Sequence, residues 1–439
     1  MSPASPRRGE RPHPGWIRVA LGVLALLVVA YGCNRRRPIP RSPDAGPLVE
    51  VVDGGGRAVE VVAQPLLDEQ EPDDDRDQAQ PLEPGKGLRG SLAAHPDGKP
   101  DQDWYAYLVQ LPTAQSGAEP TPQELAVELV PDGTADLALE VLDGEGRRMV
   151  LLDDKPAGGA ERLPGLVVRL GQTLYLRVRA SSRAPAMPPQ APYQLLLHQS
   201  AAPLGSEIEP NDTPEQAWEV AERDLFGQIS WRTDQDWFSV PLPGPQNGVD
   251  AGVARGTILR LEILSPGMEL AARLLAEGGA PLLEVRGRNG ELRLRNVGLP
   301  EGTRRILLGL RAASVRRAGQ GRYQVRVATE PALEGAEQEP NDRCEEATPL
   351  PHQRAGEVAG FLWPGDQDCF RLPLSVPSVV SLRLVGDCPA ELVVPGEPRG
   401  PSLSLRRRED LLVRVAGRGG GVCFDAPYRL EYQVAPESP

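Results

Sequence analysis

Short stretches in which apolar and polar residues alternate recur from about residue 65 to the C-terminus, and turns rich in Gly and Pro separate them. Alternation with a period of two is typical of strands that bury one face. In the middle of the chain eight such stretches follow one another, at residues 226–229, 237–242, 257–264, 270–276, 282–286, 292–295, 305–310 and 323–327. The dipeptide Asn289-Gly290 predicts a hairpin turn between two of them. We therefore expect an all-β fold, an antiparallel β-sandwich of jelly-roll type.

Three landmarks repeat along this region. The first is a six-residue acidic segment, Glu207-Ile208-Glu209-Pro210-Asn211-Asp212, which returns as Glu337-Gln338-Glu339-Pro340-Asn341-Asp342 and, less perfectly, as Glu69-Gln70-Glu71-Pro72-Asp73-Asp74. The second is an Asp-x-Asp pair followed by Trp or Cys, at Asp101-Gln102-Asp103-Trp104, Asp234-Gln235-Asp236-Trp237 and Asp366-Gln367-Asp368-Cys369. The third is a Tyr that opens the last strand, at Tyr193, Tyr323 and Tyr428.

Successive copies of the first landmark begin 138 residues apart (Glu69 to Glu207) and then 130 residues apart (Glu207 to Glu337). These intervals are far longer than the roughly 20–50 residues of solenoid repeats, which indicates whole domains in tandem. A chain of 439 residues has room for about three domains. We expect β-sandwich modules at 65–200, 203–331 and 333–439. Aromatic residues make up only 4 % of the chain, so the cores must consist mainly of Leu and Val.

The N-terminus has the features of a targeting segment. Four arginines precede an apolar run of residues 19–32 that ends at Cys33, which fits a secretory signal peptide better than a full membrane span. Ala30-Tyr31-Gly32-Cys33 resembles a bacterial lipobox, in which the Cys thiol carries lipid. The alternative is an uncleaved anchor at 1–33 in which Cys33 has no role. In both cases the remaining chain is extracytoplasmic and tethered to a membrane, and residues 34–64 form a Pro-rich linker.

The repeated acidic segment has two interpretations. Asp212 and Asp342 each precede a Glu by three residues, which is the capping-box pattern of a short helical turn. The second interpretation is a calcium site, because Ca²⁺ takes 6–8 oxygen ligands and nearby carboxylates without a cation would repel one another. The candidate ligands are Glu207, Glu209, Asn211, Asp212, Asp234 and Asp236 in the second module and Glu337, Glu339, Asn341, Asp342, Asp366 and Asp368 in the third. In the first module Asp73 replaces the Asn.

Taken together, the acidic segment, a short strand led by Gly227 or Gly360, the Asp-x-Asp pair and the closing Tyr strand resemble the bacterial pre-peptidase C-terminal (PPC) domain family. The resemblance covers nearly all of residues 65–439, three times over. It implies a β-sandwich in which the acidic segment and the Asp-x-Asp pair lie close together. Collagen-binding relatives bind calcium through acidic residues near the start of the module, and the family often accompanies secreted proteases. No protease domain accompanies the modules in this sequence.

Four of the five cysteines lie in the third module, which suggests two disulfides in an extracytoplasmic domain. Of the three possible pairings we favour Cys344–Cys369 with Cys388–Cys423. A zinc site is the alternative, although the sequence has no Cys-x-x-Cys pair.

The formal charge of −13 argues against a general nucleic-acid-binding role. None of His13, His95, His198 and His352 lies in a catalytic motif, and a catalytic site seldom appears three times. Paired carboxylates of a divergent hydrolase remain a minor alternative. We expect a non-catalytic binding or adhesion protein whose partners are protein or polysaccharide of the envelope or matrix. The alternative function is a structural spacer or assembly subunit of a cell-envelope complex.

Overall fold

The computed structural model describes residues 51–52, 58–59, 65–93, 99–110, 121–183, 190–203, 205–220, 224–243, 252–314 and 321–437. These belong to one compact unit, Gly46–Pro439. The predicted targeting segment, Cys33 and most of the linker lie outside the described residues. In the linker, β1 (Val51–Val52) pairs with β2 (Ala58–Val59) in antiparallel fashion. Among the described helices there is none with the length and apolar character needed to cross a membrane.

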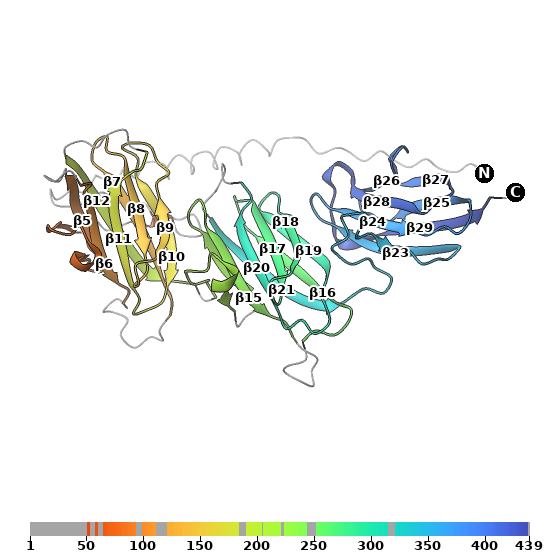
Figure 1. The fold of residues 1–439 in the computed structure, drawn as a ribbon, viewed down its shortest axis with the longest axis horizontal. Coiled ribbons are helices and arrows are strands. Elements are labelled where there is room, and N and C mark those ends of the chain that lie inside the picture. The colour runs from red at the N-terminus through yellow and green to blue at the C-terminus, as the bar shows by residue number, and fades with distance from the viewer. Residues whose placement is uncertain are drawn as a thin grey trace, which may run out of the picture. The chain divides into compact units, whose positions relative to one another are not determined.

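The remaining strands form six sheets that pack in pairs as three β-sandwiches (Figure 1). Module 1 has the sheets β10-β7-β12-β5-β3 and β4-β6-β11-β8-β9. Its strands are β3 (Leu66–Asp68), β4 (Gln80–Pro81), β5 (Gly87–Ala93), β6 (Gln102–Leu108), β7 (Gln123–Pro131), β8 (Leu137–Leu142), β9 (Arg148–Leu152), β10 (Glu161–Val168), β11 (Thr173–Ala180) and β12 (Gln190–Ala201).

Module 2 has the sheets β13-β15-β20-β17-β18 and β14-β21-β16-β19. Its strands are β13 (Trp218–Glu219), β14 (Asp224–Ile229), β15 (Gln235–Pro241), β16 (Thr257–Leu264), β17 (Leu270–Ala276), β18 (Pro281–Arg286), β19 (Glu291–Gly298), β20 (Arg305–Ala312) and β21 (Gly321–Pro331). All eight strands predicted for this module are therefore present.

Module 3 has the sheets β22-β24-β28-β26 and β23-β29-β25-β27. Its strands are β22 (Thr348–Pro349), β23 (Ala355–Leu362), β24 (Gln367–Leu372), β25 (Ser378–Val385), β26 (Ala390–Val393), β27 (Ser402–Arg407), β28 (Leu411–Gly417) and β29 (Cys423–Pro436). Three 3₁₀ turns, η1 (Arg76–Gln78), η3 (Pro214–Gln216) and η5 (Arg418–Gly420), complete the described elements.

Each module has its own core between its two sheets, built mainly of Leu and Val as the composition predicts. In module 2, Leu261 and Ile263 of β16 belong to the same core as Leu308 of β20, and none of the three side chains is exposed. Fully burying one such side chain contributes about 1.5–3 kcal/mol, so the alternation of the strands accounts for the sandwich.

The turn predicted at Asn289-Gly290 is present, but the strands on either side of it, β18 and β19, do not pair with each other as a hairpin. The two residues do form a tight turn with positive φ angles of 56° and 76°, closed by a bridge between Arg288 and Glu291. However, β18 pairs with β17 in one sheet and β19 pairs with β16 in the other. The turn therefore carries the chain from one sheet to the other, which the turn sequence alone does not specify.

The acidic segment of each module crosses from one sheet to the other. In module 2, Glu207 N–H donates to Phe226 O of β14, and Trp237 N–H of β15 donates to Asn211 O, both at 2.9 Å. The equivalent pairs are Glu69–Arg89 with Trp104–Asp73 in module 1 and Glu337–Ala359 with Cys369–Asn341 in module 3. The peptide bond between Glu and Pro is cis in all three copies. This crossing brings the segment alongside the strand that carries the Asp-x-Asp pair.

Candidate metal centres

The two acidic landmarks meet in space. In module 2, ligand oxygens of Glu209, Asp234 and Asp236 all lie within 4.8 Å of one another. In module 3 the same holds for Glu337, Glu339 and Asp368, and for Glu339, Asp342 and Asp366. In module 1 the cluster comprises Glu69, Glu71, Asp73 and Asp103. The acidic segment and the Asp-x-Asp pair of each module thus contribute to one cluster.

One oxygen of each carboxylate in module 2 is held by a donor of the chain. Backbone N–H groups of Gln228, Asn211, Ser230 and Gln235 donate to Glu207 Oε1 (3.0 Å), Glu209 Oε2 (2.8 Å), Asp234 Oδ2 and Asp212 Oδ1 (3.2 Å), and the Tyr323 hydroxyl donates to Asp236 Oδ2. These bonds fix the orientation of each carboxylate. The second oxygen is thereby directed away from the supporting backbone.

Several of the remaining oxygens in module 2 are buried and receive no hydrogen bond within the described chain. They are Glu207 Oε2, Asn211 Oδ1, Asp234 Oδ1 and Asp236 Oδ1. Asn211 and Asp236 have no exposed surface at all. Buried polar atoms without a hydrogen-bond partner are rare in folded proteins, because burying them costs free energy. A cation bound among these oxygens would offset that cost.

Module 3 repeats the arrangement with the corresponding residues. Phe361, Asn341, Trp363 and Gln367 donate N–H groups to Glu337, Glu339, Asp366 and Asp342, and the Tyr428 hydroxyl donates to Asp368 Oδ2. The oxygens left without a donor among the described residues are Glu339 Oε1, Asn341 Oδ1, Asp366 Oδ1 and Asp368 Oδ1.

Module 1 differs in two positions. Asp73 takes the place of the Asn, and both of its carboxylate oxygens are buried without a hydrogen-bond partner in the described structure. Tyr105 takes the place of Phe238 and Phe370, and its hydroxyl donates to Glu69 Oε1 at 3.1 Å. The site in module 1 therefore has more negative charge and one additional internal donor. The ligands predicted from the sequence did not include the acidic residues of module 1, although the imperfect repeat at Glu69–Asp74 was a signal for them.

The Gly and Tyr landmarks belong to the same site. Each closing Tyr lies across a Gly of the neighbouring strand: Tyr193 over Gly90, Tyr323 over Gly227 and Tyr428 over Gly360. A Cβ at any of these glycines would overlap the Tyr ring or hydroxyl. The hydroxyls donate to Asp103, Asp236 and Asp368, the second Asp of each Asp-x-Asp pair. The three repeated landmarks and the glycine thus belong to one cluster in each module.

Burial raises the pKa of these carboxyls, and neighbouring negative charges add to the effect. The pKa of Asp236 rises to about 8, that of Asp73 to about 8 and that of Glu339 to about 7. Burial also raises the pKa values of Glu207, Glu209 and Asp234 well above the ordinary range. Without a cation, ionising these groups together is unfavourable.

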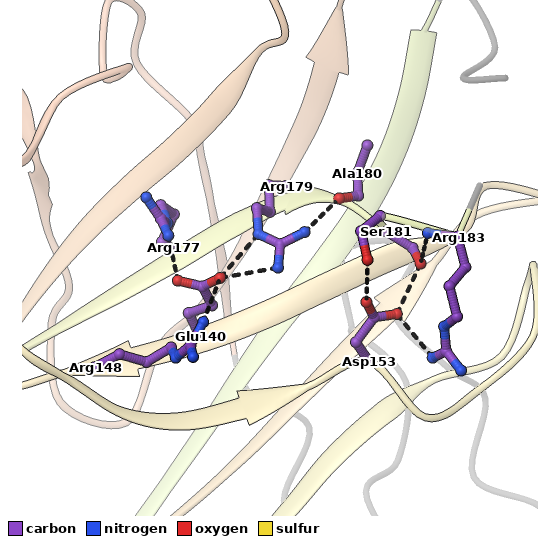
Figure 2. A network of polar contacts seen from close by, with 9 residues as sticks. Glu140, Arg148, Asp153, Arg177, Arg179, Ala180, Ser181 and Arg183 are labelled. Atoms are coloured by element: carbon purple, nitrogen blue, oxygen red, sulfur yellow. Dashed lines mark hydrogen bonds and ion pairs between the residues drawn. The ribbon is translucent and has the colours of Figure 1, made fainter. Parts of the chain in front are cut away.

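The Glu140 carboxylate of β8 shows the contrasting arrangement (Figure 2). Only 1 % of Glu140 is exposed, yet Arg177 and Arg179 of β11 both donate to it. Burial alone would raise its pKa, but the two guanidinium groups outweigh burial and hold the pKa below the ordinary value. No arginine or lysine forms a comparable ion pair with the buried carboxylates of the three clusters within the described chain.

The donor set fits a hard divalent cation. The available ligand atoms are carboxylate and amide oxygens, which Ca²⁺ and Mg²⁺ prefer, whereas zinc sites usually include His or Cys. The clusters contain neither His nor Cys. Buried acidic clusters of this composition could hold metal ions such as calcium.

The capping interpretation of Asp212 and Asp342 is wrong. The 3₁₀ turn η3 begins after Thr213, and no side chain caps it. Asp212 Oδ1 and Asp342 Oδ1 instead accept hydrogen bonds from the backbone N–H groups of Gln235 and Gln367, the middle residues of the Asp-x-Asp segments. The short helical turn exists in modules 1 and 2, but the aspartates join the two acidic landmarks rather than cap it.

The four cysteines of module 3 form the disulfides Cys344–Cys369 and Cys388–Cys423, the pairing favoured from the sequence. They are therefore not available as zinc ligands. Disulfides form in oxidising compartments, which indicates an extracytoplasmic location. His198 lies exposed on β12 and His352 in an exposed loop, and neither belongs to the acidic clusters of the described residues; His13 and His95 lie outside the described residues.

No protein-family model matches the chain, and no curated protein matches it in sequence. Among solved structures, the pre-peptidase C-terminal domain of a Bacillus anthracis collagenase matches at 12 % identity with a TM-score of 0.21, covering 30 % of this chain and 100 % of that domain. The CUB1-EGF-CUB2 domains of human MASP-1/3 match at 13 % identity with a TM-score of 0.16, covering 48 % of this chain and 99 % of that one. Scores at this level support no transfer of function. The chain itself defines three tandem β-sandwich modules with buried acidic clusters.

Proposed function

We propose that this chain is a non-catalytic binding or adhesion protein, tethered to a bacterial membrane outside the cytoplasm, whose PPC-like modules are each stabilised by calcium. The observation that supports it is the set of buried carboxylate and amide oxygens without a donor in modules 2 and 3, which lie beside carboxylate oxygens held by backbone N–H groups or a Tyr hydroxyl. Acidic clusters that recur in every module suit a structural cation better than a reaction centre.

The first experiment tests the cation. Thermal unfolding of the full chain in detergent is measured with chelator and with calcium added up to millimolar concentration. A ligand at 100 times its dissociation constant stabilises the folded state by about 2.7 kcal/mol, so the unfolding temperature should rise by several degrees. Unchanged unfolding at millimolar calcium would contradict the proposal.

Matched variants locate the effect. Glu209→Gln removes a cluster carboxylate and should abolish the calcium response of module 2. Glu269→Gln makes the same chemical change at an exposed residue of the same module and should leave the response intact. Equal responses in the two variants would mean that calcium binds elsewhere.

The binding role is tested by glycan arrays and by capture of envelope or matrix polymers, with and without chelator. Calcium-dependent retention supports the adhesion role. Co-purification with one fixed partner that survives chelation would instead indicate a structural spacer or assembly subunit. Loss of a hydrolytic activity on changing a single carboxylate would indicate an enzyme and overturn the non-catalytic assignment.

A further inference from the structure

The turn that carries one candidate ligand also carries a tryptophan that packs into the preceding module. Trp231, three residues before Asp234, is 4 % exposed and belongs to the apolar cluster of module 1. Trp363, three residues before Asp366, is 6 % exposed and belongs to the apolar cluster of module 2. Because an indole buries a large apolar area, each Trp fixes its turn against the module before it.

Hydrogen bonds tie these tryptophans to the candidate ligands. Trp363 N–H donates to Asp366 Oδ2 at 3.2 Å, and Asp366 N–H donates to Trp363 O at 3.1 Å. In module 2, Asp234 N–H donates to Trp231 O at 3.3 Å. A shift of the carboxylate therefore moves the turn that holds the indole.

The acidic segment is also bonded directly to the preceding module. Glu209 N–H donates to Val167 O of β10 at 2.9 Å. Glu339 N–H donates to Asn296 O of β19, and Gly298 N–H donates to Glu339 O, both at 3.0 Å. The buried amide of Asn296 further donates to Glu337 O. Residues whose side chains form the cluster thus use their backbone to join the modules.

An ion pair adds to the first junction. Arg322 of β21 donates two hydrogen bonds to the Glu124 carboxylate of β7, both at 2.7 Å. The Glu124 side chain is only 10 % exposed, so the pair is better shielded from solvent than a typical surface ion pair.

Module 1 provides an internal comparison. The stretch of residues 93–101, which leads to its Asp-x-Asp pair, contains no Trp, and the residues before module 1 belong to the linker. The tryptophan is present in the two modules that follow another module and is missing from the one that does not.

We propose that cation binding by modules 2 and 3 is coupled to their docking on the preceding module, so that calcium stiffens both junctions of the array. The inference rests on the calcium function proposed above. Without a cation, mutual repulsion of the carboxylates displaces the acidic segment and the Trp turn, which weakens the junction. By thermodynamic reciprocity, docking of the preceding module must tighten cation binding by the same factor.

Hydrogen–deuterium exchange of the full chain in detergent, titrated with calcium, resolves the sites separately. Peptides at 205–212 and 229–236 report module 2, those at 335–342 and 361–368 report module 3, and those at 165–168 and 294–299 report the docking strands. Trp231→Ala should raise the calcium midpoint of module 2 about tenfold, within the usual range of allosteric coupling, and leave module 3 unchanged. Trp363→Ala should do the reverse, so each variant is the control for the other.

If calcium protects the sites but Trp231→Ala leaves the midpoint of module 2 unchanged, the coupling is disproved and the calcium function stands. If no site peptide responds to calcium in the unaltered chain, the calcium function itself fails. Should Trp231→Ala prevent module 2 from folding, Asp236→Asn gives the reciprocal measurement. In that variant calcium should no longer slow exchange at 165–168 and should still slow it at 294–299; retained protection at 165–168 would overturn the coupling.

Discussion

At the residue scale, each candidate metal site depends on side chains that orient the carboxylates without belonging to the proposed ligand set. The hydroxyls of Tyr323 and Tyr428 orient Asp236 and Asp368, and a glycine provides the space in which each ring lies. The sequence marked the tyrosines and two of the glycines as landmarks. Their role in orienting the aspartates could not be predicted, because alternation assigns a residue to one face of its strand but does not show which strands lie opposite each other.

Tyr428→Phe should weaken calcium binding by module 3 about 10- to 100-fold, since removing an outer-shell partner typically costs that much metal affinity. Isothermal titration would measure the change. Tyr432→Phe is the matched control in the same module, because that hydroxyl donates to Pro351 O, outside the cluster. Equal affinities for the two variants would show that the Tyr428 hydroxyl does not position Asp368.

Gly360→Ala should destabilise module 3 by about 1–3 kcal/mol, because the new methyl group overlaps Tyr428 and must displace its ring. Chemical unfolding would measure the loss. Gly400→Ala places its Cβ no nearer than 3.9 Å to a surrounding atom and should be close to neutral. The prediction fails if the two variants are equally stable.

At the element scale, the strands follow from the sequence and their sheet membership does not. Each predicted strand of module 2 exists, because burying one face of an alternating stretch is favourable whatever its partner. The turn at Asn289-Gly290 did not reveal the pairing of its flanking strands, because a two-residue turn determines only the local direction of the chain. The capping role predicted for Asp212 was wrong because its side chain accepts a hydrogen bond from Gln235, in a segment distant in sequence, whereas a capping pattern is local. Trp231 and Trp363 were missed because their partners lie in another module.

The disulfides should matter most in module 3, the one module with cysteines. Each closes a loop of 25 or 35 residues. Chain-entropy estimates for loops of this length are about 3–4 kcal/mol, so reduction should lower the unfolding midpoint of module 3. Hydrogen exchange would show faster opening of β24 and β28, while β15 and β20 of module 2 serve as the internal control. Equal acceleration in both modules would contradict a local effect.

At the scale of the whole molecule, we expect the three clusters to make the free energy of unfolding depend on both pH and calcium. The folded chain raises the pKa of Asp73 and of Asp236 from 3.8 to about 8. The unfolded chain therefore releases these protons at lower pH than the folded chain does. Stability is fully present below about pH 4 and is lost as the pH rises through about 8.

Urea unfolding in chelator should accordingly give a lower free energy of unfolding at pH 8 than at pH 5. Saturating calcium should remove or reverse the difference, because the cation binds the ionised carboxylates. A calcium-free protein that gained stability between these two pH values would contradict the burial of unpaired carboxyls.

The carboxylate clusters also have a consequence for the timing of folding during export. Calcium sites of extracellular modules typically have dissociation constants of about 10⁻⁴–10⁻³ M, far above the range of cytosolic sensors. Sites of this strength would remain empty before the chain leaves the cytoplasm, where the disulfides are also absent. The modules would then be least stable while the chain must still be threaded through a membrane, and would become stable on the other side. We predict that chain retained in the cytoplasm is cut by protease faster than exported chain, and that calcium added after lysis removes most of the difference.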